Sequence, residues 1–138
     1  MRMTEQQLRV HQGIKPPTET QEHLALMAWA RCQPYGGRTV ADFMHHSPNG
    51  GRRSKREAAE FQRMGTLPGF PDLFLFVSVP PASGLFIELK RTKGGSVSAH
   101  QKAMLQTLRQ CGYRAEVCLG AEPAKAVICE YLGIGGEA

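Results

Sequence analysis

Two short apolar segments that flank a proline-rich turn constrain the fold of this chain most strongly. Residues 73–79 and 85–90 are rich in Leu, Phe, Ile and Val, and the five residues between them include two prolines and a glycine. Apolar runs of this length bounded by turn residues are typical of β-strands. The sequence therefore predicts an antiparallel hairpin whose strands are joined by the turn at residues 80–84.

Charged side chains occupy special positions on this hairpin. Asp72 directly follows Pro71, and a proline belongs at the first position or the edge of a strand because it cannot donate to a sheet. Glu88 and Lys90 are two residues apart on the second strand, so their side chains leave the same face. Acidic and basic residues on a strand often form a solvated face, but a buried carboxylate needs an ion partner or a metal.

The chemistry of these groups indicates a metal site. Two carboxylates brought together repel, and one of them is driven toward its neutral form unless a cation lies between them. Asp72 and Glu88 would satisfy a divalent cation such as Mg²⁺, which prefers oxygen ligands. The ammonium group of Lys90 can then contact an anionic substrate or a water molecule. This combination suits hydrolysis of a phosphodiester bond.

The remaining elements are predicted from caps, breakers and apolar spacing. We expect helices after the N-cap candidates Thr18, Ser54 and Ser98, because polar caps followed by Glu or Gln are typical helix starts. Further predictions are a long irregular loop over 33–51, a third strand over 115–119 and a last helix from Pro123 through Tyr131. The order α-loop-α-β-β-α-β-α predicts an α/β fold with a small mixed β-sheet flanked by helices, in which the second and third strands run parallel.

Length and composition set the broad class. We expect a flexible N-terminal arm over residues 1–17 and a single domain over residues 18–138. Seventeen basic against twelve acidic residues leave a net charge of +5, which fits a polyanionic partner. With four scattered cysteines, no signal peptide and no long apolar run, we expect a cytoplasmic protein without a membrane segment. A zinc site of Cys32, His45 and His46 has poor ligand spacing.

Three motifs resemble the virus-type replication-repair nuclease (VRR-NUC) family of the PD-(D/E)xK nuclease superfamily. They are Gly69-Phe70-Pro71-Asp72-Leu73, then Phe86-Ile87-Glu88-Leu89-Lys90, then Ser98-Ala99-His100-Gln101. Phage and prophage members of the family also resemble this chain outside these three motifs, because they have a loop like Pro48-Asn49-Gly50-Gly51. The resemblance covers about residues 19–132 and implies a restriction-endonuclease-like core.

The resemblance also implies roles for individual residues. Asp72 and Glu88 would bind the metal, with the backbone carbonyl of Leu89 as a further ligand, and Lys90 would position or polarise the attacking water. Gln101 would face the site, although its side chain could equally be used in the capping box with Ser98. The family also uses a glutamate of the first helix. Glu19 fits best, Glu22 is the alternative, and either could simply stabilise the helix N-terminus.

The implied activity is Mg²⁺-dependent hydrolysis of DNA, with Mn²⁺ able to substitute. We expect an endonuclease, with structure-selective cutting as one form, in phage or prophage replication, recombination or repair. Small family members resemble Holliday-junction resolvases, which act as dimers, so a homodimer is one expectation. The alternative function is a DNA-binding module on the same fold that no longer cuts. The candidate DNA-binding residues are Arg52, Arg53, Lys55, Arg56, Arg91 and Lys93.

Overall fold

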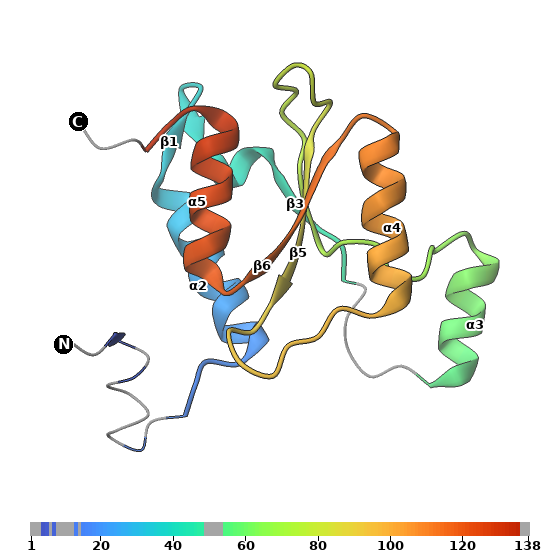
Figure 1. The fold of residues 1–138 in the computed structure, drawn as a ribbon. Helices are drawn as coiled ribbons and strands as arrows, with labels where there is room; N and C mark the ends of the chain where they lie inside the picture. Colours follow the sequence, from blue (N-terminus) through green and yellow to red (C-terminus); the bar gives the residue numbers. More distant parts are fainter. Residues whose placement is uncertain (1–3, 6, 8–12, 14, 49–53, 136–138) are drawn as a thin grey trace.

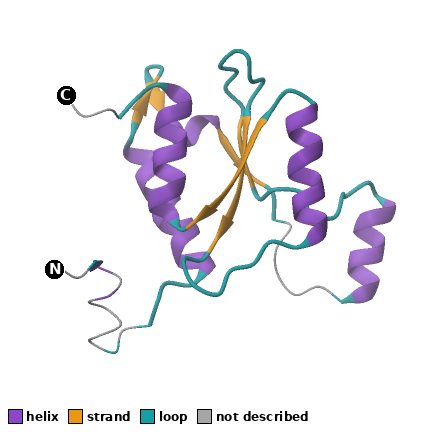
Figure 2. Ribbon diagram, viewed as in Figure 1, coloured by secondary structure: helices purple, strands orange, loops and turns teal. Residues whose placement is uncertain are grey.

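The protein folds into a mixed β-sheet with helices on both faces (Figure 1). The structure is a computed structural model that describes residues 4, 5, 7, 13, 15–48 and 54–135. The sheet has the order β3-β4-β5-β6, from β3 (Met44–His46), β4 (Leu73–Leu75), β5 (Leu85–Lys90) and β6 (Arg114–Leu119). The helices α2 (Glu19–Cys32) and α5 (Ala121–Leu132) cover one face, and α4 (Ala99–Gln110) covers the other (Figure 2). The predicted α/β class is confirmed.

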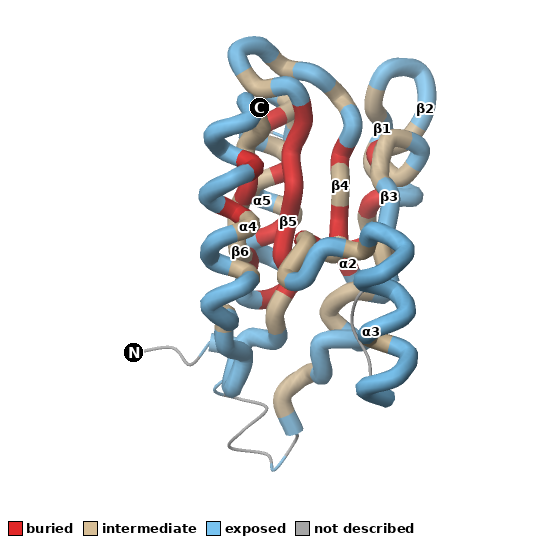
Figure 3. The backbone as a smooth tube through the Cα atoms, turned by 90° about the vertical axis from the view of Figure 1, so that its right-hand side faces the viewer, coloured by how far each residue is buried: buried red, intermediate tan, exposed pale blue. Residues whose placement is uncertain are grey.

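Strand β5 forms the centre of the core. It pairs antiparallel with β4 and parallel with β6, as the hairpin and the crossover through α4 predict. Leu85, Ile87 and Leu89 point into one apolar cluster with α2 and α5, whereas Phe86 packs on the opposite face with α4. Figure 3 shows this strand as an almost continuous buried segment. A charged residue on β5 is therefore held in a low-dielectric environment.

Polar caps fix the helix starts that the sequence predicts. Thr18 and Ser98 accept backbone N–H groups of α2 and α4 in complete capping boxes, and Ser54 caps α3 (Lys55–Arg63). None of the nine residues of α3, all of them described, is buried. This helix lies outside the layers, beyond α4 (Figure 1).

The prediction of an irregular loop over residues 33–51 was wrong for most of that segment. The chain forms a small hairpin of β1 (Pro34–Tyr35) and β2 (Arg38–Thr39), a 3-10 helix η1 (Val40–Phe43), and then β3. Gly36 and Gly37 both have positive φ, as a two-residue hairpin turn requires. β3 is stabilised by pairing with β4 rather than by its own propensity, so local sequence gave a weak signal for it.

Two further boundaries differ from the prediction. β4 ends at Leu75 rather than continuing to Val79, because the Tyr131 hydroxyl of α5 donates to Val77 O and accepts from Val79 N. α5 begins at Ala121, two residues before Pro123, which lies in its first turn as expected.

Most of the predicted arm over residues 1–17 lies outside the described residues. No helix among the described residues is long and apolar enough to cross a membrane.

Candidate active site

The pairing of β4 with β5 places Asp72 opposite Glu88. The antiparallel register pairs Phe74 with Phe86 and Leu73 with Ile87, so its continuation by one residue matches Asp72 with Glu88. Side chains opposite one another in an antiparallel pair share a face and lie close together. The Phe74 and Phe86 rings on that face are stacked with centroids 4.3 Å apart. The same register that stacks these rings brings the two carboxylates together.

The two carboxylates are joined through the backbone of the opposite strand. The backbone N–H of Asp72 donates to Glu88 Oε2 at 3.3 Å, and the N–H of Leu89 donates to Asp72 Oδ1 at 3.0 Å. The carbonyl of an extended residue points to the same side of the strand as its N–H, so the Leu89 carbonyl is expected on the β4 side of β5. The structure therefore brings together the side chains of Asp72 and Glu88, and the Leu89 carbonyl stays a predicted third ligand.

Burial makes both carboxylates hard to ionise together. Glu88 is only 5% exposed. Burial, followed by the charge of Asp72, raises the pKa of Glu88 to about 7. The pKa of Asp72 is raised as well, chiefly by burial, although its hydrogen bond from Leu89 acts in the opposite direction. A positive charge between the two groups would relieve this repulsion.

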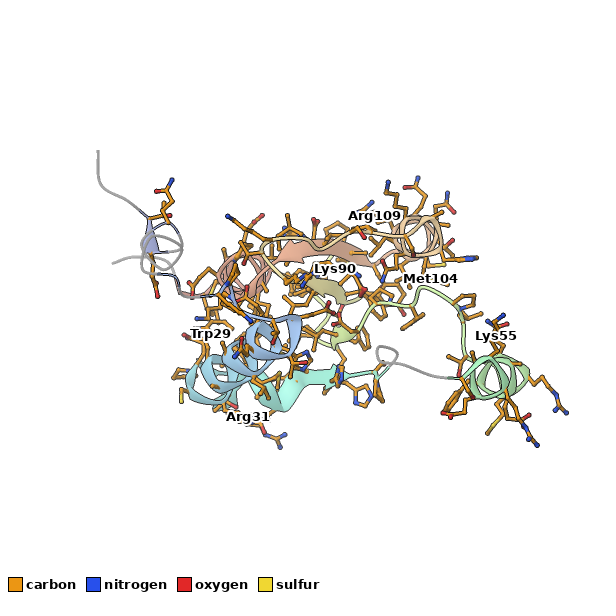
Figure 4. All side chains as sticks on the ribbon, turned by 90° about the horizontal axis from the view of Figure 1, so that it is seen from below. Trp29, Arg31, Lys55, Lys90, Met104 and Arg109 are labelled. Atoms are coloured by element: carbon orange, nitrogen blue, oxygen red, sulfur yellow. The ribbon has the colours of Figure 1, made fainter. Side chains whose placement is uncertain are left out.

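Lys90 lies beside the carboxylate pair. Its Nζ is 3.4 Å from Glu88 Oε1, and its side chain is 13% exposed. Its charge lowers the pKa of Glu88 but does not outweigh burial and Asp72. In the view from below, Lys90 lies in the middle of the molecule, between α2 and α4 (Figure 4). A partly exposed ammonium group in this position can reach an anion in the neighbouring cleft.

The two roles considered for Gln101 occur together. Its Oε1 accepts the N–H of Ser98 in the capping box, and its Nε2 donates to Glu88 Oε1. Because the capping bond uses the oxygen, the amide nitrogen is left facing the carboxylate. α4 is thus connected to the site through its first turn.

The structure separates the two candidate glutamates of α2. Glu19 lines a cleft of about 800 Å³ together with Asp72, Glu88, Lys90 and Gln101. Burial is the main cause of the raised pKa of Asp72, and the charge of Glu19 adds to it. Glu22 lines a different cleft, where its Oε2 accepts a 2.7 Å hydrogen bond from Thr92. Glu19 is therefore the carboxylate of α2 that faces the site.

Two histidines also line this cleft, and the sequence predicted neither as a partner of Asp72. His46 on β3 donates from Nδ1 to Asp72 O at 3.1 Å, since a carbonyl oxygen only accepts. The ring of His23 on α2 meets that of His46 edge-on, with centroids 4.4 Å apart. Burial and the nearby His46 lower the pKa of His23. Without β3, which local sequence did not reveal, this contact could not be foreseen.

The candidate DNA-binding residues are not gathered in one place. Arg91 and Lys93 are exposed just beyond the end of β5. Lys55 and Arg56 are exposed on the first turn of α3, and Figure 4 shows Lys55 far from Lys90. Arg52 and Arg53 lie outside the described residues. Of the four candidates that the structure describes, only Arg91 and Lys93 directly extend the positive charge of Lys90.

The donor atoms of the cleft fit a hard divalent cation. In the described part of the chain, no three His, Cys, Asp or Glu side chains are grouped to hold a metal, so the zinc site of Cys32, His45 and His46 is not formed. Mg²⁺ commonly uses one or two carboxylates and keeps several waters. Asp72 and Glu88, with the Leu89 carbonyl as the expected third ligand, would form such an oxygen set, and a bound cation would offset the burial that raises the pKa of both carboxyl groups.

Comparisons with known proteins agree with this geometry. The family model described as the VRR-NUC domain matches residues 18–122. A solved structure titled "VRR_NUC domain protein" superposes with a TM-score of 0.78 and is 34% identical, covering 88% of this chain and 93% of that chain. No curated protein matches the sequence.

Proposed function

This chain belongs to the VRR-NUC domain family, whose members are nuclease-type domains, and on that premise we propose that it is a Mg²⁺-dependent DNA endonuclease. The observation that carries the proposal is the half-buried Asp72 hydrogen-bonded to the buried Glu88, with Lys90 beside them. Two carboxylates with raised pKa values lower the stability of a fold when ionised, and groups of this kind often belong to functional sites. We further propose that Mn²⁺ can substitute for Mg²⁺.

The reaction is hydrolysis of a phosphodiester bond. A water oxygen attacks phosphorus, the bond to the leaving oxygen breaks, and one strand end keeps the phosphate while the other becomes a hydroxyl. A metal ion held by Asp72, Glu88 and the Leu89 carbonyl would lower the pKa of water and neutralise charge on the phosphate. The hydrogen bonds from Asp72 N–H to Glu88 and from Leu89 N–H to Asp72, which join these residues of the two strands, support this ligand set.

The chain's own residues provide orientation and charge. Lys90 is close enough to the carboxylates to donate to a phosphate oxygen or to the attacking water. Gln101 fixes the Glu88 carboxylate through Nε2, so the carboxylate does not need to reorient during the reaction. Glu19 adds a third negative charge at the cleft and would hold a water or a metal-bound ligand. Arg91 and Lys93 would contact the DNA backbone beyond the reacting phosphate.

The biological setting is part of the proposal. The Pro48-Asn49-Gly50-Gly51 segment resembles phage and prophage members, which supports a role in phage replication, recombination or repair. Asn49, Gly50 and Gly51 lie outside the described residues, as do Arg52 and Arg53. We further propose that the protein acts as a homodimer and cuts selected DNA structures, because small relatives resemble junction resolvases.

The test is a cleavage assay on defined DNA structures. Purified protein is incubated with supercoiled plasmid, flap, splayed-arm and four-way-junction DNA, in Mg²⁺, in Mn²⁺ or in EDTA. We expect cutting only with a divalent metal, and loss of cutting in Asp72→Ala. Cutting that persists in EDTA would exclude the metal site, and binding without cutting in every condition would favour a non-cutting DNA-binding module.

A further inference from the structure

Gly69 lies three residues before Asp72 and contacts the backbone of another element. Its φ is +75°, and a Cβ atom at this position would lie 2.5 Å from His100 C, 2.6 Å from His100 O and 2.7 Å from Gln101 N. All three atoms belong to the main chain of the first turn of α4. A side chain on α4 could rotate away from a new methyl group, but these backbone atoms cannot.

The backbone that Gly69 contacts belongs to a residue of the site. Gln101 is fixed on the same turn by two hydrogen bonds with Ser98, and its Nε2 holds Glu88. The contact with Gly69 therefore fixes how closely the segment that ends in Asp72 approaches the Gln101–Glu88 pair. Pro71, between Gly69 and Asp72, is fully buried, so the segment has little room to adjust.

The segment is also held by β3. The carbonyl oxygen of Asp72 accepts the N–H of Ser47 at 2.8 Å, in a continuation of the β3–β4 pairing. The segment is thus hydrogen-bonded to β3 at Asp72 and packed against the first turn of α4 at Gly69. A shift away from α4 would have to break or lengthen hydrogen bonds to β3.

From this geometry we infer that Gly69 is a positioning residue, which sets the distance between Asp72 and the Glu88–Gln101 pair. The inference rests on the proposed function, since the distance matters for metal binding. A Cβ atom requires about 1 Å of separation, and a displacement of that size at a catalytic group can cost about 10²-fold in rate.

The chain offers a matched control for the backbone strain alone. Gly65 has a φ of +105°, and a Cβ atom there would have nothing within 4 Å. Gly65→Ala and Gly69→Ala both force alanine into a positive φ, but only Gly69→Ala creates a contact with α4. A second pair, Gly65→Asn and Gly69→Asn, lowers the strain because asparagine tolerates positive φ better than alanine. Both Gly69 variants keep the added Cβ.

The first readout needs no metal. The Leu89 N–H donates to Asp72 Oδ1, so its hydrogen exchange in the metal-free protein reports whether Asp72 is in place. We expect Leu89 to lose protection by about tenfold or more in both Gly69 variants while the amides of β6 keep theirs, and to be unchanged in both Gly65 variants.

The second readout is Mn²⁺ affinity by calorimetry, with cleavage rates alongside. We expect the dissociation constant to rise about 10- to 100-fold in both Gly69 variants and in neither Gly65 variant. If the wild-type protein binds no Mn²⁺ and does not cut, the proposed function fails, whereas Leu89 exchange still tests the contact. Equal behaviour of the Gly69 and Gly65 variants, or global unfolding of both Gly69 variants, would overturn the positioning role.

Discussion

Glu19 and Glu22 are three residues apart on α2, yet their carboxylates serve different parts of the molecule. Glu19 lines the cleft that contains Asp72 and Glu88. Glu22 accepts a hydrogen bond from Thr92, and its Oε2 lies so close to the Gly120 backbone that a Cβ there would approach it to 2.6 Å. Gly120 is the N-cap of α5 and has no side chain to cap the helix, so a carboxylate beside it is favourable. Glu22 therefore places a carboxylate of α2 beside the N-terminus of α5.

This division predicts different effects of two similar substitutions. Glu19→Gln removes a charge at the site, so we expect the cleavage rate to fall by at least about tenfold with little change in stability. Glu22→Gln weakens the contact with Thr92 and α5, so we expect about 1 kcal/mol of lost stability and a nearly unchanged rate. Unfolding followed by the fluorescence of the single tryptophan, Trp29, and cleavage kinetics measure both quantities. The reverse pattern would assign Glu22 to the site.

Lys90 is expected to act on the phosphate or water rather than through metal affinity. Lys90→Met keeps the apolar stem but removes the charge, and we expect kcat to fall about 10²- to 10³-fold. The matched control is Lys93→Met, three residues further on and exposed, which should affect mainly KM. The kcat and KM of both variants are measured across a range of Mn²⁺ concentrations. A loss in Lys90→Met that high Mn²⁺ fully restores would contradict this role.

The raised pKa of Glu88 predicts an unusual pH dependence of stability in the metal-free protein. In the unfolded chain Glu88 releases its proton near pH 4.5, whereas in the folded protein it keeps it until about pH 7. Between these values the folded state binds more protons than the unfolded chain, so the free energy of unfolding falls as pH rises. The contribution of protonated Glu88 to this free energy is fully lost above pH 7. Urea unfolding at pH 5 and pH 8 measures the difference.

Glu88→Gln should flatten this dependence, and Glu60→Gln on exposed α3 is the control that should leave it unchanged. Saturating Mn²⁺ should reverse the trend, because metal binding requires deprotonated carboxylates and stabilises the folded state. A Glu88→Gln profile identical to that of the wild type would show that this carboxyl titrates normally in the folded protein.

His46 is expected to support Asp72 through its Nδ1 hydrogen bond. Asparagine carries an amide nitrogen at the same branch position, so His46→Asn can keep the bond, whereas His46→Phe keeps only the ring contact with His23. Loss of a hydrogen bond with a net contribution of about 1 kcal/mol corresponds to a change of about fivefold. We therefore expect the cleavage rate of His46→Phe to fall by about that factor. His45→Phe, next along β3, is the control. Equal rates in the Asn and Phe variants at position 46 would show that the bond is not used.

Local sequence was informative wherever one segment determines its own structure. The N-cap at Thr18, the capping box at Ser98, the strand over Leu85–Lys90 and the placement of Asp72 and Glu88 on adjacent strands of one hairpin were all predicted. Each depends on residues close in the chain or on a hairpin with a short connection. β3 was missed because its three residues, Met44 to His46, are a strand only in the presence of β4.

By itself, the sequence indicated the α/β class through side-chain periodicity, and its motifs resembled the VRR-NUC family, which in turn implied the candidate site residues Asp72, Glu88 and Lys90. Only the tertiary structure decided which glutamate of α2 faces the site, how Gln101 serves both Ser98 and Glu88, and why Gly69 must lack a side chain. Those features depend on contacts between elements distant in the chain. Such contacts are set by packing in three dimensions, which no local pattern encodes.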